Sequence, residues 1–240
     1  MSRVIAMWAH SRSTSTAFQR MMIERGDVIV VHEPWLALTE TGSAALPAGD
    51  GGTAIVSSGT ELRDHLIRLG RLRPVFVKEV MDYRYPCLFD SPAEVASFTH
   101  TFIVREPRQT IASHYAMKPT VTSPEIGFER LAELFDLVWS VTEQKPLVLR
   151  AERLADDAAA VVREFCDYTG LPFMPEAISW RPEDRPEWRR HRAWHLEAIN
   201  SSGFTDQRNA YEVTVDNNPV LRSFYDHHYP FYEHLVLHAG

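Results

Sequence analysis

The sequence predicts an α/β fold: a parallel sheet in a three-layer arrangement, with helices on both faces. One observation is that short apolar runs, typical of buried strands, alternate along the chain with helical segments. Another is that two of these runs, at residues 4–8 and 101–104, each lead into a polar turn and then a helix. A chain of 240 residues with 45% hydrophobic content can bury a large core. No boundary divides it, so we expect a single domain over residues 1–240.

The expected elements follow one another in strand-helix order. Strands are predicted near residues 4–8, 28–31, 75–78, 101–104 and 147–149. Helices are predicted near residues 15–25, 60–69, 108–117, 124–144 and 155–169. Residues 41–52 are rich in Gly, Ala and Pro and predict a flexible loop. Ligands bind at the C-terminal ends of the strands in such sheets, so the polar turns are candidate binding sites.

Residues 5–22, IAMWAHSRSTSTAFQRMM, predict a strand, a hydroxyl-rich turn and the start of a helix. The first N–H groups of a helix lack partners within it and carry partial positive charge, so such a turn favours an anion. Arg12 adds a full charge, and the hydroxyl donors are Ser13, Thr14, Ser15 and Thr16. The turn lacks the Gly-Lys-Ser/Thr ending of a nucleoside triphosphate loop. The alternative is that its serines only cap the helix.

Residues 99–115, THTFIVREPRQTIASHY, repeat this pattern of apolar strand, charged turn and helix. Arg105 ends the strand, Pro107 suits the first turn of a helix, and Ser113 follows about two turns later. We expect Arg105 and Ser113 to reach one phosphate beside the sheet edge. The alternative is a surface ion pair for the arginine and a solvated helix face for the serine.

Together the two turns resemble those of sulfotransferases that use 3′-phosphoadenosine 5′-phosphosulfate (PAPS). The resemblance implies that Arg12 and the hydroxyls of residues 13–16 bind the 5′-phosphosulfate. It also implies that Arg105 and Ser113, spaced as in the family's Arg-x-Pro turn, bind the 3′-phosphate. The implied fold is the P-loop NTPase-like sulfotransferase fold. The implied reaction moves the sulfuryl group from PAPS to a hydroxyl or amine and releases adenosine 3′,5′-bisphosphate (PAP).

Two other functions stay open at this point. A small-molecule kinase of the same fold would need a Walker lysine together with Ser/Thr and Asp ligands for Mg²⁺, and the sequence shows no such set. A non-catalytic nucleotide-binding regulatory protein would bind PAP without turning over any acceptor.

Sulfuryl transfer needs a base for the acceptor proton and cations for the charge on the leaving phosphate. Glu33 directly follows a predicted strand, and the resemblance implies that it is the base. Its neighbours Pro34 and Trp35 are expected to raise its pKa. His32 is the rival base, although strand alternation should point it away from the face that Glu33 uses. Lys78 and Arg12 are expected to stabilise charge on the sulfonate and the leaving phosphate. A helix cap or a surface ion pair is the alternative for Glu33.

The late segment of residues 188–204 combines tryptophans and arginines with a Ser-Ser-Gly turn. The family closes its 3′-phosphate site with a late basic loop, which implies that Ser201, Ser202 and Gly203 belong to this site. An amphipathic helix with solvated arginines is the alternative. The residues expected to contact an acceptor, besides His32, are Trp8, Trp35, Tyr83 and Tyr85.

The composition and charge of the chain limit the classes of binding partner that we expect. A net charge of −7 argues against a general nucleic-acid surface, so we expect a small-molecule acceptor. No apolar run is long enough to cross a bilayer and the first residues do not resemble a leader, so we expect a cytoplasmic protein without membrane contact. Two cysteines and scattered histidines match no known metal motif, so no metal is expected. The oligomeric state stays open, because the amphipathic C-terminal segment can pack internally or between the subunits of a homodimer.

Overall fold

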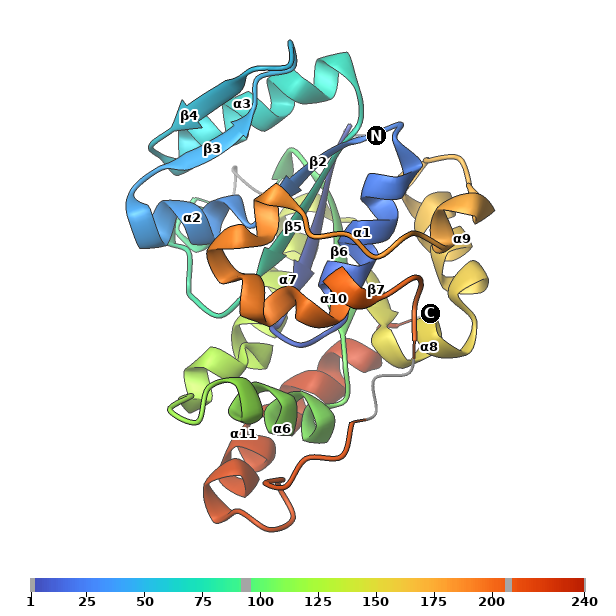
Figure 1. The fold of residues 1–240 in the computed structure, drawn as a ribbon. Coiled ribbons are helices and arrows are strands. Elements are labelled where there is room, and N and C mark those ends of the chain that lie inside the picture. The colour runs from blue at the N-terminus through green and yellow to red at the C-terminus, as the bar shows by residue number, and fades with distance from the viewer. Residues whose placement is uncertain (1–2, 92–95, 206–208, 240) are drawn as a thin grey trace.

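The computed structural model describes residues 3–91, 96–205 and 209–239, and a five-stranded sheet lies at its centre (Figure 1). The strands are β1 (Val4–Ala9), β2 (Ile29–His32), β5 (Val75–Val80), β6 (Thr99–Val104) and β7 (Leu147–Arg150). They are parallel in the order β2-β5-β1-β6-β7, which confirms the predicted sheet. Most of them extend slightly further at the C-terminal end than the apolar runs indicated.

Helices and short 3-10 helices surround this sheet (Figure 1). The N-terminal helices are α1 (Ser15–Arg25), α2 (Pro34–Thr41), α3 (Gly59–Leu72), α4 (Pro86–Phe89) and α6 (Pro107–Met117). The later ones are α7 (Phe128–Thr142), α8 (Ala151–Asp156), α9 (Ala158–Thr169), α10 (Leu196–Asn200) and α11 (Pro219–Val236). The 3-10 helices are η1 (Ser123–Ile126), η2 (Pro175–Ile178) and η3 (Pro186–His195).

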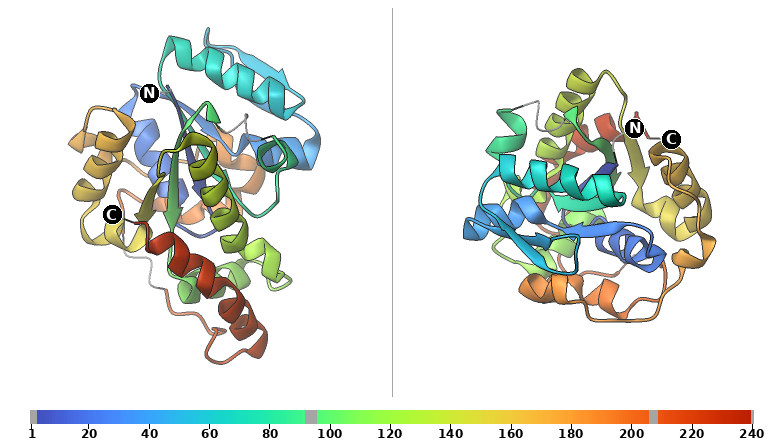
Figure 2. Two further views of the ribbon diagram at one scale, coloured as in Figure 1. Left: turned by 180° about the vertical axis from the view of Figure 1, so that it is seen from behind. Right: turned by 90° about the horizontal axis from the view of Figure 1, so that it is seen from above.

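Apolar side chains hold helices against both faces of the sheet, as the views from behind and above show (Figure 2). On one face Phe18 of α1 and Phe165 of α9 pack on each other and on Phe76 of β5, with the first two ring centroids 4.9 Å apart. On the other face α3, α7 and α11 cover the sheet, and Phe102 of β6 contacts Phe135 of α7 at 5.4 Å. This arrangement confirms the predicted three-layer α/β fold.

The predicted flexible loop at residues 41–52 is wrong, because most of it belongs to a hairpin. The strands β3 (Ala44–Pro47) and β4 (Thr53–Val56) pair in an antiparallel manner. Ala44 and Leu46 alternate with exposed residues and are buried in the core beside α3. His65 of α3 further bonds the Pro47 carbonyl at 2.8 Å. Alternating burial therefore outweighed the turn-forming composition.

The predicted helices at residues 124–144 and 155–169 are each interrupted near the N-terminal end. Gly127 has φ +87°, a left-handed conformation that ends η1 and begins α7. Asp157 ends α8, and its side chain accepts the backbone N–H of Ala160 at the start of α9. Within the described parts of the chain, no helix is both long and apolar enough to cross a membrane.

The segment that contains η3 and α10 runs across the front of α1 in the view of Figure 1. Trp188 holds it there, because its fully buried ring packs with Ala198, Ile199 and Ile23 of α1. The segment therefore lies near the C-terminal ends of β1, β2 and β5, where the predicted turns meet.

Candidate active site

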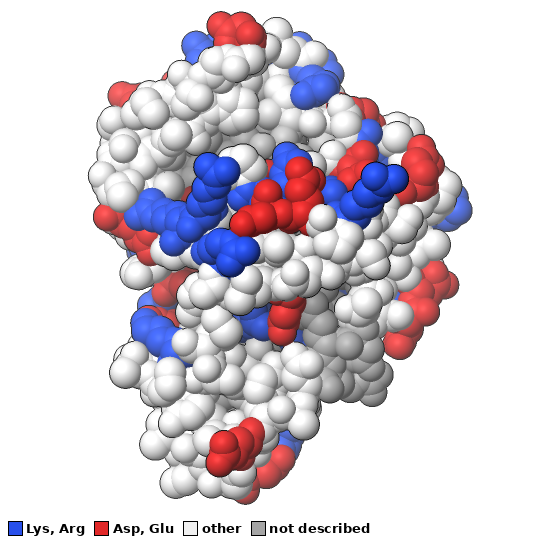
Figure 3. Space-filling model, in the orientation of Figure 1, with Lys and Arg blue, Asp and Glu red and all other residues white. Residues whose placement is uncertain are grey.

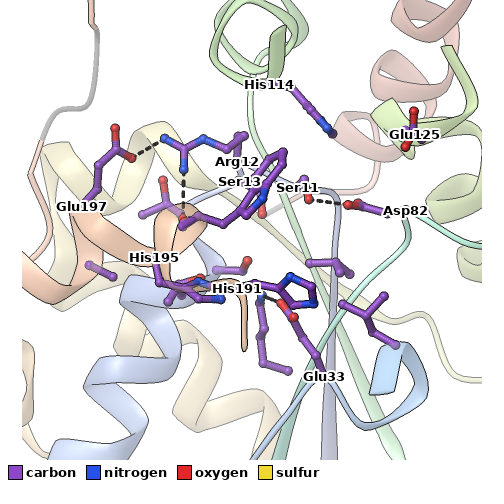
Figure 4. A pocket seen from close by; sticks show the side chains of 18 of the residues that line it. Ser11, Arg12, Ser13, Glu33, Asp82, His114, Glu125, His191, His195 and Glu197 are labelled. Atoms are coloured by element: carbon purple, nitrogen blue, oxygen red, sulfur yellow. Dashed lines mark hydrogen bonds and ion pairs between the residues drawn. The ribbon is translucent and has the colours of Figure 1, made fainter. Parts of the chain in front are cut away.

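A pocket of about 240 Å³ lies at the C-terminal ends of β1, β2 and β5 (Figure 4). The turn after β1 and the start of α1 supply Ser11, Arg12, Ser13, Thr14, Ser15, Thr16 and Ala17. The ends of β2 and β5, with the residues after them, supply Glu33, Leu36, Glu40, Lys78, Val80, Asp82 and Tyr83. The remaining lining residues are His114, Lys118, Glu125, His191, Trp194, His195, Glu197 and Ala198.

The turn between β1 and α1 has the features of an anion cradle. Arg12 and Thr14 have positive φ angles of 65° and 70°, a strained conformation that tight functional turns often hold. Thr14 precedes α1 but makes no capping bond through its side chain, and the Ser13 hydroxyl is buried without a partner among the described residues. An anion at the pocket satisfies both groups, so the residues present fit a phosphate or sulfate group.

Arg12 connects the two predicted phosphate turns. Its Nε donates to Ser113 Oγ at 2.8 Å, and the Arg105 guanidinium donates to the Arg12 carbonyl at 3.3 Å. Its remaining nitrogens donate to the Trp194 carbonyl at 3.1 Å and to Glu197 Oε2 at 2.6 Å. The structure thus brings Arg12, Arg105 and Ser113 together, and of these three only Arg12 lines the pocket.

His10 holds the same two turns at a fixed spacing. Its Nε2 accepts the backbone N–H of Arg105 at 3.0 Å, so the ring proton lies on Nδ1, which donates to the Ser11 carbonyl at 2.9 Å. Burial lowers the pKa of His10 to about 3, which keeps the ring neutral and preserves this pattern of bonds. No local signal in the sequence marks His10 for this role.

Glu33 and Lys78 form a buried ion pair beside the cradle. In the register of β2 and β5, Lys78 lies opposite His32. The backbone N–H of Glu33, the residue after His32, donates to the Lys78 carbonyl at 2.8 Å. Lys78 Nζ donates to Glu33 Oε1, and the two side chains are only 2% and 7% exposed. Such a pair is stable only while both charges remain.

The expected direction of the Glu33 pKa shift is wrong. Burial by itself raises the pKa of this carboxyl, but the nearby His32 and Lys78, together with the hydrogen bond from Lys78, lower it well below its ordinary value. The apolar neighbours Pro34 and Trp35 therefore do not decide its charge. Glu33 is ionised at neutral pH and becomes a stronger base only when Lys78 turns to another anion.

His32 lies against Glu33, contrary to the expectation from strand alternation. Glu33 has a φ of 43° and turns out of the strand, which brings its carboxylate back toward its neighbour. His32 Nε2 is 3.4 Å from Glu33 Oε2, and its Nδ1 donates to Gln19 Oε1 at 2.8 Å. His32 does not line the pocket, so the structure corrects its predicted contact with an acceptor.

Three aromatic residues predicted to contact the acceptor belong to the core instead. Trp8 is fully buried, packs against Trp35 with ring centroids 5.3 Å apart, and donates its indole N–H to a core histidine. Tyr85 is 1% exposed and donates its hydroxyl to a β5 carbonyl at 2.6 Å. These side chains are apolar enough to be drawn into the interior. Tyr83, 41% exposed, does line the pocket.

The Ser-Ser-Gly turn at Ser201, Ser202 and Gly203 also lies outside the pocket, which corrects its predicted place in the phosphate site. Ser201 Oγ accepts the Trp180 indole N–H, and the Ser202 carbonyl accepts the Trp180 backbone N–H, each at 3.1 Å. The turn therefore anchors the end of α10. The Ser201 hydroxyl also donates to the Ala198 carbonyl at 2.9 Å, so it is used within the fold.

Two of the exposed arginines of η3, Arg190 and Arg192, are paired with carboxylates. Arg190 contacts Glu40 at 2.7 Å, and Arg192 contacts Asp184 at 2.7 Å. Figure 3 shows basic and acidic side chains alternating in a band across this face. The segment is therefore neither a free basic loop nor a plain amphipathic helix.

Several pocket residues escaped the sequence analysis. Burial raises the pKa of Asp82 to about 6, and the Ser11 hydroxyl donates to this carboxyl at 2.7 Å. The position of Asp82 just after β5 could have indicated a site residue, because ligands bind at the C-terminal ends of parallel strands. Burial also lowers the pKa of His114 to about 4 and of His195 to about 3. His195 lies in the segment of residues 188–204, in which only the Ser-Ser-Gly turn was expected to belong to the site. No local signal in the sequence marks Glu125.

Comparison with known proteins places the fold and site in a family. A family model described as a sulfotransferase domain matches residues 2–238. The chain belongs to this sulfotransferase family. Membership in this family, together with the parallel sheet, supports a transferase. The family model thus confirms that the chain is a sulfotransferase, as the resemblance of its two turns indicated.

Among solved structures, the sulfotransferase resembles the sulfotransferase domain from the curacin biosynthetic pathway, with a TM-score of 0.51 and 13% identity over 95% of this chain and 97% of that one. Another is the sulfotransferase domain of the Synechococcus PCC 7002 olefin synthase, with a TM-score of 0.49 and 16% identity over 92% and 94% of the two chains. At these identities the first likeness shows the fold alone.

A curated relative from Arabidopsis thaliana is named branched-chain-amino-acid aminotransferase-like protein 2. The two are 26% identical over 208 residues, which is 84% of this chain and 36% of the relative. The sulfotransferase thus spans about a third of the length of that protein.

Proposed function

We propose that this sulfotransferase moves the sulfuryl group of PAPS to a hydroxyl or amine of a small-molecule acceptor and releases PAP. One observation carries the proposal: the Lys78–Glu33 pair opens onto the same pocket as the cradle, whose Ser13 hydroxyl has no partner among the residues that the structure describes. An anion site next to a buried carboxylate and a cation supplies what sulfuryl transfer needs.

In this proposed reaction, the residues of the pocket have separate roles. Residues 13–16 and the start of α1 hold the phosphosulfate, and Lys78 turns from Glu33 to the sulfonate oxygens. Glu33, freed from its partner, accepts the proton that the acceptor loses as its oxygen or nitrogen bonds to sulfur. The bond between sulfur and the phosphate oxygen breaks, and Arg12 with Lys78 neutralises the charge on the departing phosphate.

A pocket of about 240 Å³ suits a small acceptor better than a polymer. In Figure 4 Asp82 and Glu125 lie across the pocket from Arg12 and Glu197, with Glu33 below. We assign the acceptor to the side of Asp82 and Tyr83, and the donor to the side of the cradle. A cytoplasmic location remains a prediction from the sequence.

The proposal is tested by calorimetric titration with PAP, with ATP plus Mg²⁺ as the comparison ligand. PAP is expected to bind roughly 10- to 100-fold more tightly, the range that one charged contact to its 3′-phosphate provides. EDTA should lower neither this binding nor turnover. A preference for ATP with Mg²⁺ would indicate a kinase, and PAP binding without turnover of any screened acceptor would indicate a regulatory protein.

Arg105→Ala is expected to weaken PAP binding by about 1.5 to 3 kcal/mol, because a charged hydrogen bond to the 3′-phosphate is lost. Titration calorimetry measures this change. Arg108→Ala is the matched control, since Arg108 lies three residues further on, in the first turn of α6, and pairs with Asp216 at the surface. Equal PAP affinity in the Arg105 and Arg108 variants would remove Arg105 from the 3′-phosphate site.

A further inference from the structure

Two histidines and the carboxylate of Glu33 converge beside the cradle. One ligand atom from each of His32, Glu33 and His195 lies within 4.8 Å of the other two. All three side chains are deeply buried: His32 and Glu33 are 9% and 7% exposed, and His195 is 4% exposed. His32 ends β2, Glu33 follows it, and His195 ends η3, so only the folded chain brings the three together.

The neighbours of His32 show which of its two ring nitrogens carries the proton and which has a lone pair. The Trp188 indole can only donate, and it points at Gln19 Oε1 at 3.3 Å, which identifies that atom as the amide oxygen. His32 Nδ1, 2.8 Å from the same oxygen, therefore carries the ring proton. His32 Nε2 is left as an acceptor, 3.4 Å from the acceptor Glu33 Oε2. Two acceptors at this distance are held together by a cation between them, which is either a proton on His32 Nε2, the form in which His32 lowers the pKa of Glu33, or a metal ion.

His195 supplies the second observation that points to a ligand. Its Nε2 is buried and has no hydrogen-bond partner in the described structure. Its Nδ1 lies 3.2 Å from Thr16 Oγ1, and in the tautomer that donates from Nδ1 to this hydroxyl, Nε2 carries a lone pair. Histidines that bind metals are commonly held in this way by a polar partner on the other ring nitrogen.

We propose that His32, Glu33 and His195 bind a divalent transition-metal ion of the Zn²⁺ type. A tetrahedral ion bound at about 2.1 Å holds its ligand atoms about 3.4 Å apart. His32 Nε2 and Glu33 Oε2 already have this separation. Two imidazoles and one carboxylate favour Zn²⁺ over Mg²⁺ or Ca²⁺, which prefer oxygen ligands.

Metal binding and catalysis compete for the same carboxylate. Lys78 bonds Glu33 Oε1, so a metal ion on Oε2 is repelled by the ammonium and at the same time removes the lone pair that accepts the proton. The ion is therefore an inhibitor rather than a participant in transfer. This consequence rests on the proposed function, whereas the binding itself does not.

The test is calorimetric titration of EDTA-stripped, dialysed protein with ZnCl₂, and with MgCl₂ for comparison. One Zn²⁺ should bind per chain, and His195→Gln and His32→Gln should each weaken binding at least tenfold. His114→Gln is the matched control, because His114 lines the same pocket and also has a buried ring nitrogen without a partner in the described structure. Its Zn²⁺ affinity should stay within twofold of the wild type. Lys78→Met should bind Zn²⁺ more tightly.

Visible absorption of the wild-type protein with Co²⁺ in place of Zn²⁺ needs no variant. Intense bands of a four- or five-coordinate site are expected, and their absence would overturn the proposal. Equal Zn²⁺ affinity in the wild type and both cluster variants would overturn it as well. Binding of Zn²⁺ without binding of PAP would leave the metal site and remove the proposed function. Binding of PAP without Zn²⁺ would do the reverse.

Discussion

Glu33→Gln is expected to slow sulfuryl transfer by roughly 100-fold or more, the usual effect of losing a general base. The amide keeps the shape of the side chain and can still contact Lys78, but it cannot accept the proton of the acceptor. Because Glu33 lies beside the cradle and not in it, PAP affinity should change little. Turnover under saturating donor, with calorimetry of PAP binding, measures both.

Glu40→Gln provides the control for this variant. Glu40 lines the same pocket, but its carboxylate pairs with Arg190 and His191 on the outer side. Its turnover should stay within a few-fold of the wild type. A Glu33 variant that turns over as fast as this control would assign the base role to another residue, and His195, which lines the same pocket, is a candidate.

Lys78→Met is expected to lower both stability and turnover. Removing one partner of a buried pair leaves the other charge uncompensated, which typically costs about 3 to 5 kcal/mol of unfolding free energy. Turnover falls because the sulfonate and the leaving phosphate lose their nearest cation. Urea unfolding and steady-state kinetics measure the two effects separately.

The double variant Lys78→Met, Glu33→Gln separates the two roles of this pair. It removes both charges, so most of the lost stability should return, while turnover should stay low. Arg222→Met, which breaks the exposed pair with Asp226, should change stability by less than about 1 kcal/mol. A single Lys78 variant as stable as the Arg222 variant would show that the buried charges are not interdependent.

The positions of strands and helices along the chain were largely predictable, because apolar runs and polar turns are local properties of the sequence, whereas the order of the strands in the sheet was not predicted. The predicted helix at residues 15–25 has the observed bounds, and all five predicted strands are present. The hairpin at β3 and β4 was missed, since its burial depends on contact with α3. The interruption at Gly127 depends on a single left-handed residue inside an otherwise helical pattern.

Within the site, residues on the strand-helix turns were predictable, because the C-terminal ends of parallel strands must meet at one edge. The meeting of Arg12 with Arg105 and Ser113 follows from this rule. Acceptor contacts were poorly predicted: Trp8, Trp35 and Tyr85 have the composition of a binding pocket but are part of the core. Aromatic side chains are removed from water both in a binding pocket and in the core. Residue type alone therefore cannot show which of these two places an aromatic residue occupies.

The sequence by itself determined the family, the parallel sheet and the anion turn, because each depends on residues that are neighbours in the chain. Tertiary structure decided the charge of Glu33, the burial of His32 and the approach of His195. These depend on segments far apart in sequence, β2, β5 and η3, whose side chains meet only after packing. Electrostatic interactions fall off over a few ångströms, so the chemistry of this carboxylate is set by neighbours that the fold supplies.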